Sequence, residues 1–380
     1  MAADPIYLDH NATTPLLPEV VHAMLPYLRA HFGNPSSGHV YGRRARDAVD
    51  KARGQVAALI ACAPDELVFT SGGTEASNLA IRGVAELRRD RRRLVTTAIE
   101  HAATANPVTW LAEQDWQVTR LGVDADGVVR PAEAGPALAG AALLTVIHAH
   151  NETGVVQPIA ELARLAHAAG ALVHTDAAQS IGKVPVNVGE LGVDLLSLAG
   201  HKLYAPKGVG ALYVKKGTPI APLLRGAAHE HGLRPGTENV AAIVGLGRAC
   251  ELVARDLERR AARTSRRREL LWSLLSAGVP GLARHGDPAR CLPNTLSVRF
   301  PAASGVAVLA NAPEIAASTG SACHDGRDQA PAVLLAMGIP AEAALGTVRL
   351  TLGRSTTDAD MRTTAAALTR AWRTVTATMA

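Results

Sequence analysis

The sequence predicts an α/β protein with a mostly parallel sheet in a large unit and a second, smaller α+β unit. Short apolar runs alternate with helical stretches between residues 67 and 214, as in strand–helix–strand units. These runs are apolar throughout, which is typical of strands buried on both faces. A chain of 380 residues, 48% of them hydrophobic, is longer than a single hydrophobic core usually stabilises. We therefore expect a large unit at 14–255 and a smaller one built from 1–13 and 256–380.

The chain is expected to begin with an extended arm at 6–15, followed by two helices. The stretch Pro18–His31 has helical apolar spacing and a proline at its start, and Tyr41–Ala61 reads as a long amphipathic helix. Helices at Glu75–Leu87 and Pro158–Ala169 lie among the strands of the sheet. The expected strands are Leu67–Thr70, Leu94–Thr97, Leu143–Ala149, Ala171–Thr175, Leu195–Leu198 and Gly210–Val214.

The last third of the chain predicts the smaller unit. A helical stretch rich in alanine, leucine and arginine runs from Asn239 to about Ser276 and carries the expected boundary. Beyond it we expect strands at Thr295–Phe300, Glu314–Ala317 and Gly346–Leu352, and helices at Gly305–Ala310, Pro331–Met337 and Asp358–Met379.

Composition and charge argue against several classes of function. Aromatic residues make up only 3% and the net charge is +5, which disfavours direct nucleic-acid binding. The four cysteines form no Cys-x-x-Cys pair, so neither a metal site nor a disulfide framework is indicated. The sequence shows no signal segment and no apolar run of membrane-spanning length. We therefore expect a cytoplasmic protein without a membrane partner.

Polar residues follow the expected strands, at the edge where open parallel sheets bind ligands. Lys202 comes just after a buried strand, where an amine in a low dielectric can act as a nucleophile toward a carbonyl. Taken alone, it could equally be a surface lysine. The other residues at this edge are Thr74, His101, Asn151, Asp176, Gln179 and His201. Seven such residues at one edge favour a common site over seven unrelated structural roles.

This group has the chemistry that pyridoxal 5'-phosphate requires. Lys202 would hold its aldehyde as a Schiff base, and Asp176 would keep its ring nitrogen protonated. The turn Ser71–Thr74, which includes Gly73, would offer backbone N–H groups to the phosphate at a helix start. His101 would cover the ring. The turn has neither a P-loop lysine nor a Gly-x-Gly-x-x-Gly pattern, which disfavours a nucleotide.

A second group of candidate residues lies in the smaller unit. Cys323 stands in a loop of small residues beside His324, a setting that would expose the thiol and favour its thiolate. Cys62 and Cys250 lie in apolar helical stretches and are expected to be inert. Arg349, on an expected strand, is a candidate for binding a substrate α-carboxylate, although it could also be an ordinary surface arginine.

Over nearly its whole length the chain resembles the pyridoxal-phosphate-dependent cysteine desulfurases and selenocysteine lyases of the class V aminotransferase-like group. The motifs that carry this resemblance are Tyr7–Pro15, Gly33–Ser37, Phe69–Glu75, Glu100-His101, Asn151–Gly154, His174–Gln179, Gly200–Lys202, Arg234–Asn239, Gly320–Cys323 and Leu352–Thr357.

The resemblance implies the type I fold of pyridoxal-phosphate enzymes, a homodimer, and a role for each motif residue. Lys202 would be the Schiff-base lysine, and His101 would stack on the ring and assist proton transfer. Asn34 and Arg349 would bind the amino-acid carboxylate, and Cys323 would take up sulfur. Thr237 would reach the phosphate of the neighbouring subunit. The remaining cofactor contacts would come from Gly73, Thr74, Asn151, Asp176, Gln179 and His201.

The expected activity is removal of sulfur from L-cysteine, giving L-alanine and a persulfide on Cys323 that passes to an acceptor protein. A selenocysteine lyase is the first alternative, because Ala322–Gln329 and Arg234–Asn239 look closer to the lyases. An aminotransferase or a non-catalytic scaffold of the same fold also remains open. Ala199 departs from the family, whose members often have a serine there that bonds the phosphate.

Overall fold

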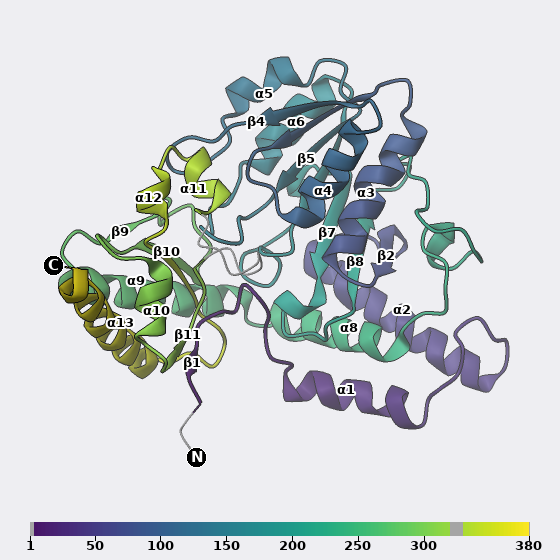
Figure 1. The fold of residues 1–380 in the computed structure, drawn as a ribbon. Helices are drawn as coiled ribbons and strands as arrows, with labels where there is room; N and C mark the ends of the chain where they lie inside the picture. The colour runs from purple at the N-terminus through teal and green to yellow at the C-terminus, as the bar shows by residue number, and fades with distance from the viewer. Residues whose placement is uncertain (1–3, 320–329, 380) are drawn as a thin grey trace.

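The computed structural model describes residues 4–319 and 330–379 and is centred on a seven-stranded sheet (Figure 1). The strand order is β2-β8-β7-β6-β5-β3-β4. β8 pairs antiparallel with β2 and β7, and all other neighbours are parallel, so the sheet is mostly parallel as predicted. The strands are β2 (Leu67–Thr70), β3 (Arg93–Thr97), β4 (Gln117–Leu121), β5 (Leu143–Ile147), β6 (Leu172–Asp176), β7 (Leu195–Ala199) and β8 (Gly210–Val214).

Both faces of this sheet are covered by helices, which explains why its central strands are apolar throughout. Successive side chains of a strand point to opposite faces, and Leu143 and Leu144 accordingly belong to two different hydrophobic cores. One core packs α3 (Gly73–Leu87) and α4 (Ala102–Ala112) on the sheet. The other contains residues of α2 (Val40–Ile60), α6 (Ile159–Ala168) and α8 (Val240–Ala254).

Three elements between residues 98 and 142 were not expected from the sequence. β4 is a partly exposed edge strand in which polar residues predominate. α4 carries Pro107 inside the helix, and α5 (Pro131–Ala137) carries Pro136. Proline and polar residues weaken the local signal, whereas packing against the sheet stabilises these elements in the fold.

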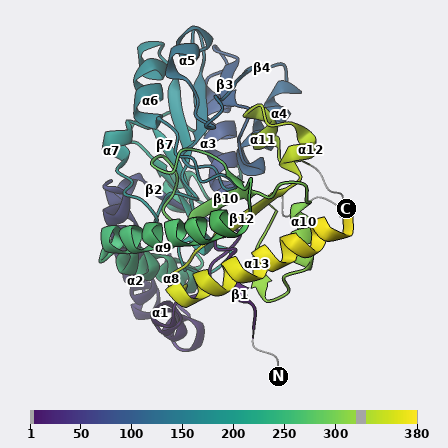
Figure 2. The same ribbon diagram turned by 90° about the vertical axis from the view of Figure 1, so that its left-hand side faces the viewer.

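The C-terminal part forms a separate layer with its own core. β10 (Thr295–Arg299) pairs antiparallel with β9 (Ala283–Arg284) and β12 (Thr347–Thr351). Figure 2 shows α9 (Leu257–Gly278) and α13 (Asp358–Met379) side by side across this layer. Its short helices are α10 (Gly305–Ala310), α11 (Ala332–Ala336) and α12 (Ala341–Ala344).

The N-terminal arm joins this C-terminal layer. β1 (Ile6–Tyr7) pairs with β11 (Ile315–Ala316), and Leu8 is buried in the core with Phe300.

The helical stretch expected from Asn239 consists of two helices, α8 and α9, that break at Arg255 and Asp256. Because the sheet and the C-terminal layer have separate cores, we propose that the chain divides at 13/14 and 255/256. The remaining helices are α1 (Pro18–Arg29), α7 (Val188–Leu191), η1 (Pro64–Glu66), η2 (Gly200–Lys202) and η3 (Glu230–Gly232).

A buried network of side-chain hydrogen bonds connects the central strands of the sheet with α3. The imidazole of His174 contacts Thr145 Oγ1 at 2.8 Å and Ser197 Oγ at 2.9 Å, and Ser197 contacts Ser77 of α3 at 3.2 Å. Burial lowers the pKa of His174 to about 3, so the ring is neutral and can donate on one side and accept on the other. This network of hydrogen bonds therefore holds β5, β6, β7 and α3 rigidly together.

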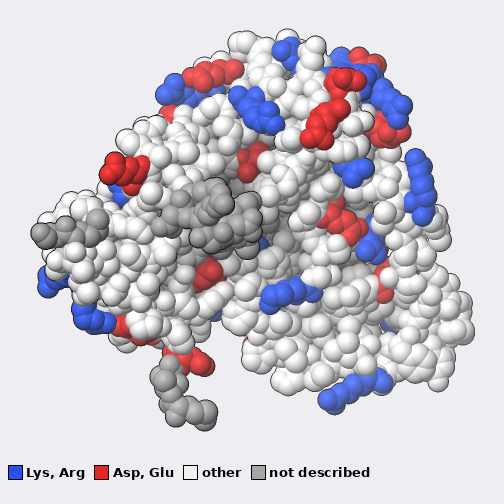
Figure 3. Space-filling model, viewed as in Figure 1, with Lys and Arg blue, Asp and Glu red and all other residues white. Residues whose placement is uncertain are grey.

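The surface carries both signs of charge. In Figure 3, lysine and arginine side chains lie interspersed with aspartate and glutamate over the upper part of the molecule. Within residues 4–319 and 330–379, no helix combines the length and the apolar character needed to cross a lipid bilayer.

Candidate functional site

A cavity of about 350 Å³ opens at the carboxyl edge of the seven-stranded sheet. β3, β5, β6 and β7 run parallel, so the loops that follow them meet at this edge. The cavity also reaches β12 and the N-terminal segment. Predicted site residues that line it are Gly73, Thr74, His101, Asn151, Asp176, Gln179, His201, Lys202 and Arg349. Residues that line it without having been predicted as site residues include Asn11, Ala12, Ala103, Ile147, Ala178 and Ala199.

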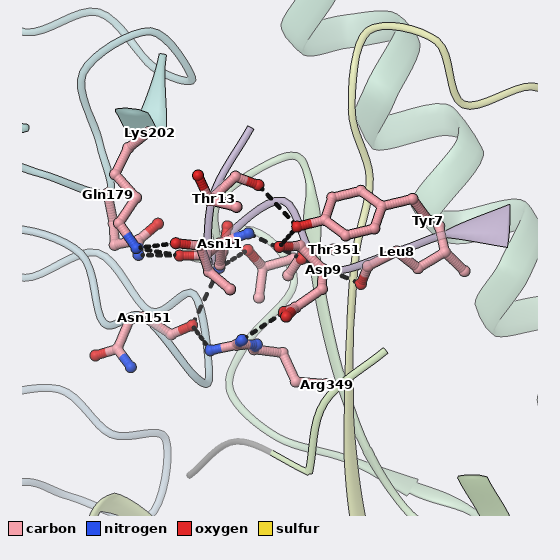
Figure 4. A network of polar contacts seen from close by, with 12 residues as sticks. Tyr7, Leu8, Asp9, Asn11, Thr13, Asn151, Gln179, Lys202, Arg349 and Thr351 are labelled. Atoms are coloured by element: carbon pink, nitrogen blue, oxygen red, sulfur yellow. Dashed lines mark hydrogen bonds and ion pairs between the residues drawn. The ribbon is translucent and has the colours of Figure 1, made fainter. Parts of the chain in front are cut away.

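Lys202 ends the short helix η2, which follows β7. Its Nζ donates to the main-chain oxygens of Asn11 at 2.5 Å and Ala12 at 2.8 Å (Figure 4). Burial lowers the pKa of Lys202 to about 8; the positive charge of Arg349 adds to this, and the charges of Asp176 and Asp9 oppose it. About a tenth of the amine is therefore unprotonated at pH 7, far more than for an ordinary lysine, and this is the form that attacks a carbonyl.

Asp176 is the last residue of β6, and its Oδ1 accepts the N–H of Ala178 at 2.9 Å. Burial raises the pKa of Asp176, while the hydrogen bond from Ala178 and the charges of His101 and Lys202 lower it. No basic side chain of the described residues forms an ion pair with this carboxylate. A protonated ring nitrogen would supply the compensating charge, so this position fits pyridoxal phosphate.

His101 directly precedes α4, and its Nδ1 accepts the N–H of Ala103 at 3.1 Å. This hydrogen bond assigns the proton of the neutral ring to Nε2. The imidazole is exposed at the cavity wall. It can therefore cover a planar ligand and exchange a proton at Nε2.

The N-terminus of α3 forms another wall of the cavity. The helix begins at Gly73, and Gly72 in the cap position provides no side-chain hydrogen bond to its first N–H groups. A Cβ added to Gly73 would lie 3.3 Å from Ala199 Cβ, so the start of the helix packs closely against Ala199, and both residues line the cavity. A helix of this length favours an anion at its start, so the position fits a phosphate group. Ala199 places a methyl group, not a hydroxyl donor, beside it.

Arg349 lies on β12 and is almost fully buried. Its Nη2 forms an ion pair with Asp9 Oδ1 at 2.6 Å, and its Nη1 donates to the main-chain oxygen of Asn151 at 3.1 Å (Figure 4). The interpretation as a surface arginine is therefore wrong. A substrate carboxylate would share this guanidinium with Asp9, which lies in the motif Tyr7–Pro15 but for which the sequence predicted no role of its own.

Gln179 and His201 both contact the N-terminal segment. Gln179 Nε2 donates to the main-chain oxygen of Asn11 at 2.9 Å, and His201 Nδ1 lies 3.2 Å from Thr13 Oγ1. Burial and the neighbouring charge of Lys202 lower the pKa of His201 to about 4. The segment Tyr7–Pro15 was noted as a motif of the resemblance, but no local signal connects it to residues about 170 to 190 positions away.

Three predicted residues are not placed at the cavity. Asn34 lies in the α1–α2 loop, where its Oδ1 accepts the N–H of Ser36 at 2.9 Å. Thr237 is exposed in the segment before α8. Cys323 and its neighbour His324 lie outside the described residues. The roles of Asn34, Thr237 and Cys323 thus stay predictions.

The three cysteines that the structure describes are poor nucleophiles. Burial raises the pKa of Cys62 to about 12, of Cys250 to about 12 and of Cys291 to about 11. The expectation that Cys62 and Cys250 are inert thiols agrees with this.

Comparison with known proteins gives consistent matches over most of the chain. The family model "Aminotransferase class-V" matches residues 6–363. The chain is 42% identical over 369 residues to cysteine desulfurase IscS of Dictyoglomus turgidum, covering 96% of this chain and 94% of that protein. It is 44% identical over 359 residues to a cysteine desulfurase of Trichormus azollae, covering 94% and 90%.

Solved structures show the same fold. A NifS-like protein superposes with a TM-score of 0.90 at 35% identity, covering 98% of this chain and 99% of that one. SspA in complex with cysteine superposes with a TM-score of 0.81 at 33% identity, covering 91% and 98%. The predicted α/β architecture is confirmed.

Proposed function

Because the chain belongs to the aminotransferase class-V family, we propose that it is a pyridoxal-phosphate-dependent cysteine desulfurase. It would convert L-cysteine into L-alanine and hold the sulfur as a persulfide on Cys323 for an acceptor protein. The observation that carries this proposal is the meeting of the Lys202 amine, the Asp176 carboxylate and the α3 N-terminus in one cavity. The relatives named cysteine desulfurase support the choice of reaction.

Different residues of the cavity would bind different parts of the cofactor. Lys202 would hold its aldehyde, Asp176 would face the ring nitrogen, and the start of α3 at Gly73 and Thr74 would bind the phosphate. Once bound, pyridoxal phosphate serves as an electron sink for the substrate amino acid. Further contacts would come from Asn151, Gln179 and His201. In a homodimer, Thr237 of each subunit would reach the phosphate in the other.

The chain's own groups would position the substrate and move its protons. Arg349, oriented by Asp9, would bind the α-carboxylate together with Asn34. The Lys202 amine would accept the Cα proton, a role for which its pKa of about 8 is suited. His101 would cover the ring and transfer a proton at Nε2.

Sulfur transfer would join the substrate sulfur to Cys323. The Cβ–S bond of cysteine breaks, an S–S bond to Cys323 forms, and the thiol proton of Cys323 ends on Cβ, giving alanine and a persulfide. Thiols with a pKa of 11 or above, such as those of the other three cysteines, are poorly suited to this attack.

The test is a substrate panel of L-cysteine and L-selenocysteine, scored for alanine and for released sulfide or selenide. We expect alanine from cysteine and a persulfide on the peptide that contains Cys323. Cys323→Ala should abolish the persulfide and keep the cofactor spectrum, whereas the matched variant Cys62→Ala should retain both. Turnover of selenocysteine alone would replace this proposal with a selenocysteine lyase.

A further inference from the structure

We propose that the turn at residues 9–14 is a dock for the ε-amine of Lys202 and that Asn11 is the positioning residue that holds this dock in place. The amine would occupy the dock whenever it is not bonded to an aldehyde. The value of the dock for catalysis rests on the proposed function, because only there does a free Lys202 amine act as a base.

Within this dock, two successive main-chain oxygens hold the amine. Lys202 Nζ lies 2.5 Å from Asn11 O and 2.8 Å from Ala12 O (Figure 4). A carbonyl oxygen accepts a hydrogen bond from a neutral amine as well as from an ammonium. A carboxylate in its place would favour the ammonium and make the amine less reactive. The dock can therefore hold Lys202 without forcing it to stay protonated.

Asn11 is fixed because each of its polar atoms is bonded. The residue is 1% exposed. Besides Lys202, it has six hydrogen-bond partners, three on each side of the cavity. Its partners near the sheet edge are Asn151, Gln179 and Lys183, and those in the C-terminal layer are Asn294, Thr295 and Thr351. Its carbonyl therefore cannot move unless both parts of the molecule move with it.

Lys183 sets the orientation of the Asn11 side chain. Its Nζ donates to Asn11 Oδ1 at 2.7 Å and to Gln179 Oε1 at 2.6 Å. No carboxylate of the described residues forms an ion pair with this lysine, although it is largely enclosed. Because both acceptors are amide oxygens, which only accept, the Lys183 amine is the donor in each contact. It fixes Oδ1 on its own side and directs Nδ2 toward Asn151 O and Thr295 Oγ1. This arrangement holds the Asn11 side chain in one orientation, while the main-chain oxygen of the same residue accepts from Lys202.

The test measures acetylation of Lys202 in the full-length chain after removal of the cofactor. Acetic anhydride is the probe, the exposed Lys207 in the same chain is the internal reference, and mass spectrometry quantifies each site. The measured quantity is the limiting rate at high pH, where the amine is neutral in every variant. Asn11→Ala should raise this rate about fivefold, the value of one net hydrogen bond.

A milder variant separates docking from a failure to fold. Thr351→Val removes the acceptor of the Asn11 N–H at 3.1 Å, together with the hydrogen bond that this hydroxyl donates to Leu8 O at 3.2 Å, while keeping the side-chain shape. It should raise the rate about twofold. Thr347→Val is the matched control, since Thr347 is a buried residue of the same strand that contacts His285 and not Asn11. It should leave the rate unchanged.

Two outcomes would overturn the dock. One is a folded Asn11→Ala chain, checked by circular dichroism, that acetylates Lys202 at the wild-type limiting rate. The other is an equal effect of Thr347→Val and Thr351→Val. Neither readout requires turnover, so a chain that makes no alanine from cysteine would refute the proposed function and leave the dock unaffected.

Discussion

The carboxyl edge of the seven-stranded sheet and the N-terminal segment 6–14 meet at the same cavity, which Asn11 and Ala12 of the segment line, and they contribute different chemistry. The edge contributes reactive side chains, among them Lys202, Asp176 and His101. The segment contributes main-chain oxygens that accept from Lys202 and a carboxylate, Asp9, that pairs with Arg349. The comparison indicates that the edge performs the chemistry while the segment sets its geometry. Substitutions at the edge should therefore change reactivity, whereas those in the segment should change stability or positioning.

The largest effect is expected from Lys202→Ala. Without the amine the cofactor has no covalent attachment and the substrate loses its base, so alanine formation should fall by at least about 10³-fold. Absorbance spectra of the purified protein and an alanine assay measure the two losses. The matched control Lys207→Ala removes an exposed lysine five residues away and should change neither. An unchanged spectrum in Lys202→Ala would contradict the role of the edge.

Asp176→Asn tests the second group at the edge. The amide keeps the oxygen that accepts from Ala178 but loses the charge that would hold a ring nitrogen protonated, so kcat should fall about 10²-fold. Asp194→Asn is the control: that buried carboxylate accepts the N–H of Val173 at the opposite end of the strands. It should lower stability and leave the cofactor spectrum intact. Equal losses of kcat in both variants would show that Asp176 acts only structurally.

Asp9→Asn tests the segment. Arg349 is 3% exposed, so loss of its partner at 2.6 Å leaves a buried charge poorly compensated. The free energy of unfolding should drop by about 2–3 kcal/mol, somewhat less than for a fully enclosed pair because Asp9 is partly exposed. Urea unfolding measures this change. The exposed Asp4→Asn should be neutral. If the Asp9→Asn chain is stable but has lost its cofactor spectrum, the segment takes part in the chemistry and does not merely set the geometry of the edge.

The smallest effect is a change with pH in the rate at which the cofactor-free chain captures pyridoxal phosphate. The pKa of Lys202 is lowered to about 8, so the rate should rise about tenfold per pH unit below pH 8 and then level off. Stopped-flow absorbance measures this rate. A midpoint near the ordinary lysine value of 10.5 would contradict the lowered pKa.

The same lowered pKa of Lys202 has a consequence for stability. Between pH 8 and 10.5 the unfolded chain binds more protons than the folded one, because its lysine keeps the ordinary pKa. The cost of burying this lysine should therefore fall as the pH rises through that window. Below pH 8 both states are protonated, and the cost is present in full.

Much of the sheet could be read from local patterns. The boundaries of Leu67–Thr70 and Gly210–Val214 agree with the structure residue for residue, because short apolar runs between turns have few other solutions. The edge strand Gln117–Leu121 and the proline-containing α4 could not be read, since their stability comes from packing. The helix break at Arg255 and Asp256 could not be read from local patterns either.

The sequence by itself determined the cavity residues of the sheet edge, from Thr74 to Lys202, because parallel strands carry the residues after them to one edge. Only the tertiary structure decided what surrounds Lys202. Its contacts with Asn11 and Ala12 are made by main-chain oxygens, which every residue type possesses and no sequence pattern reveals. The pair Asp9–Arg349 joins residues 340 positions apart, a separation that only folding closes.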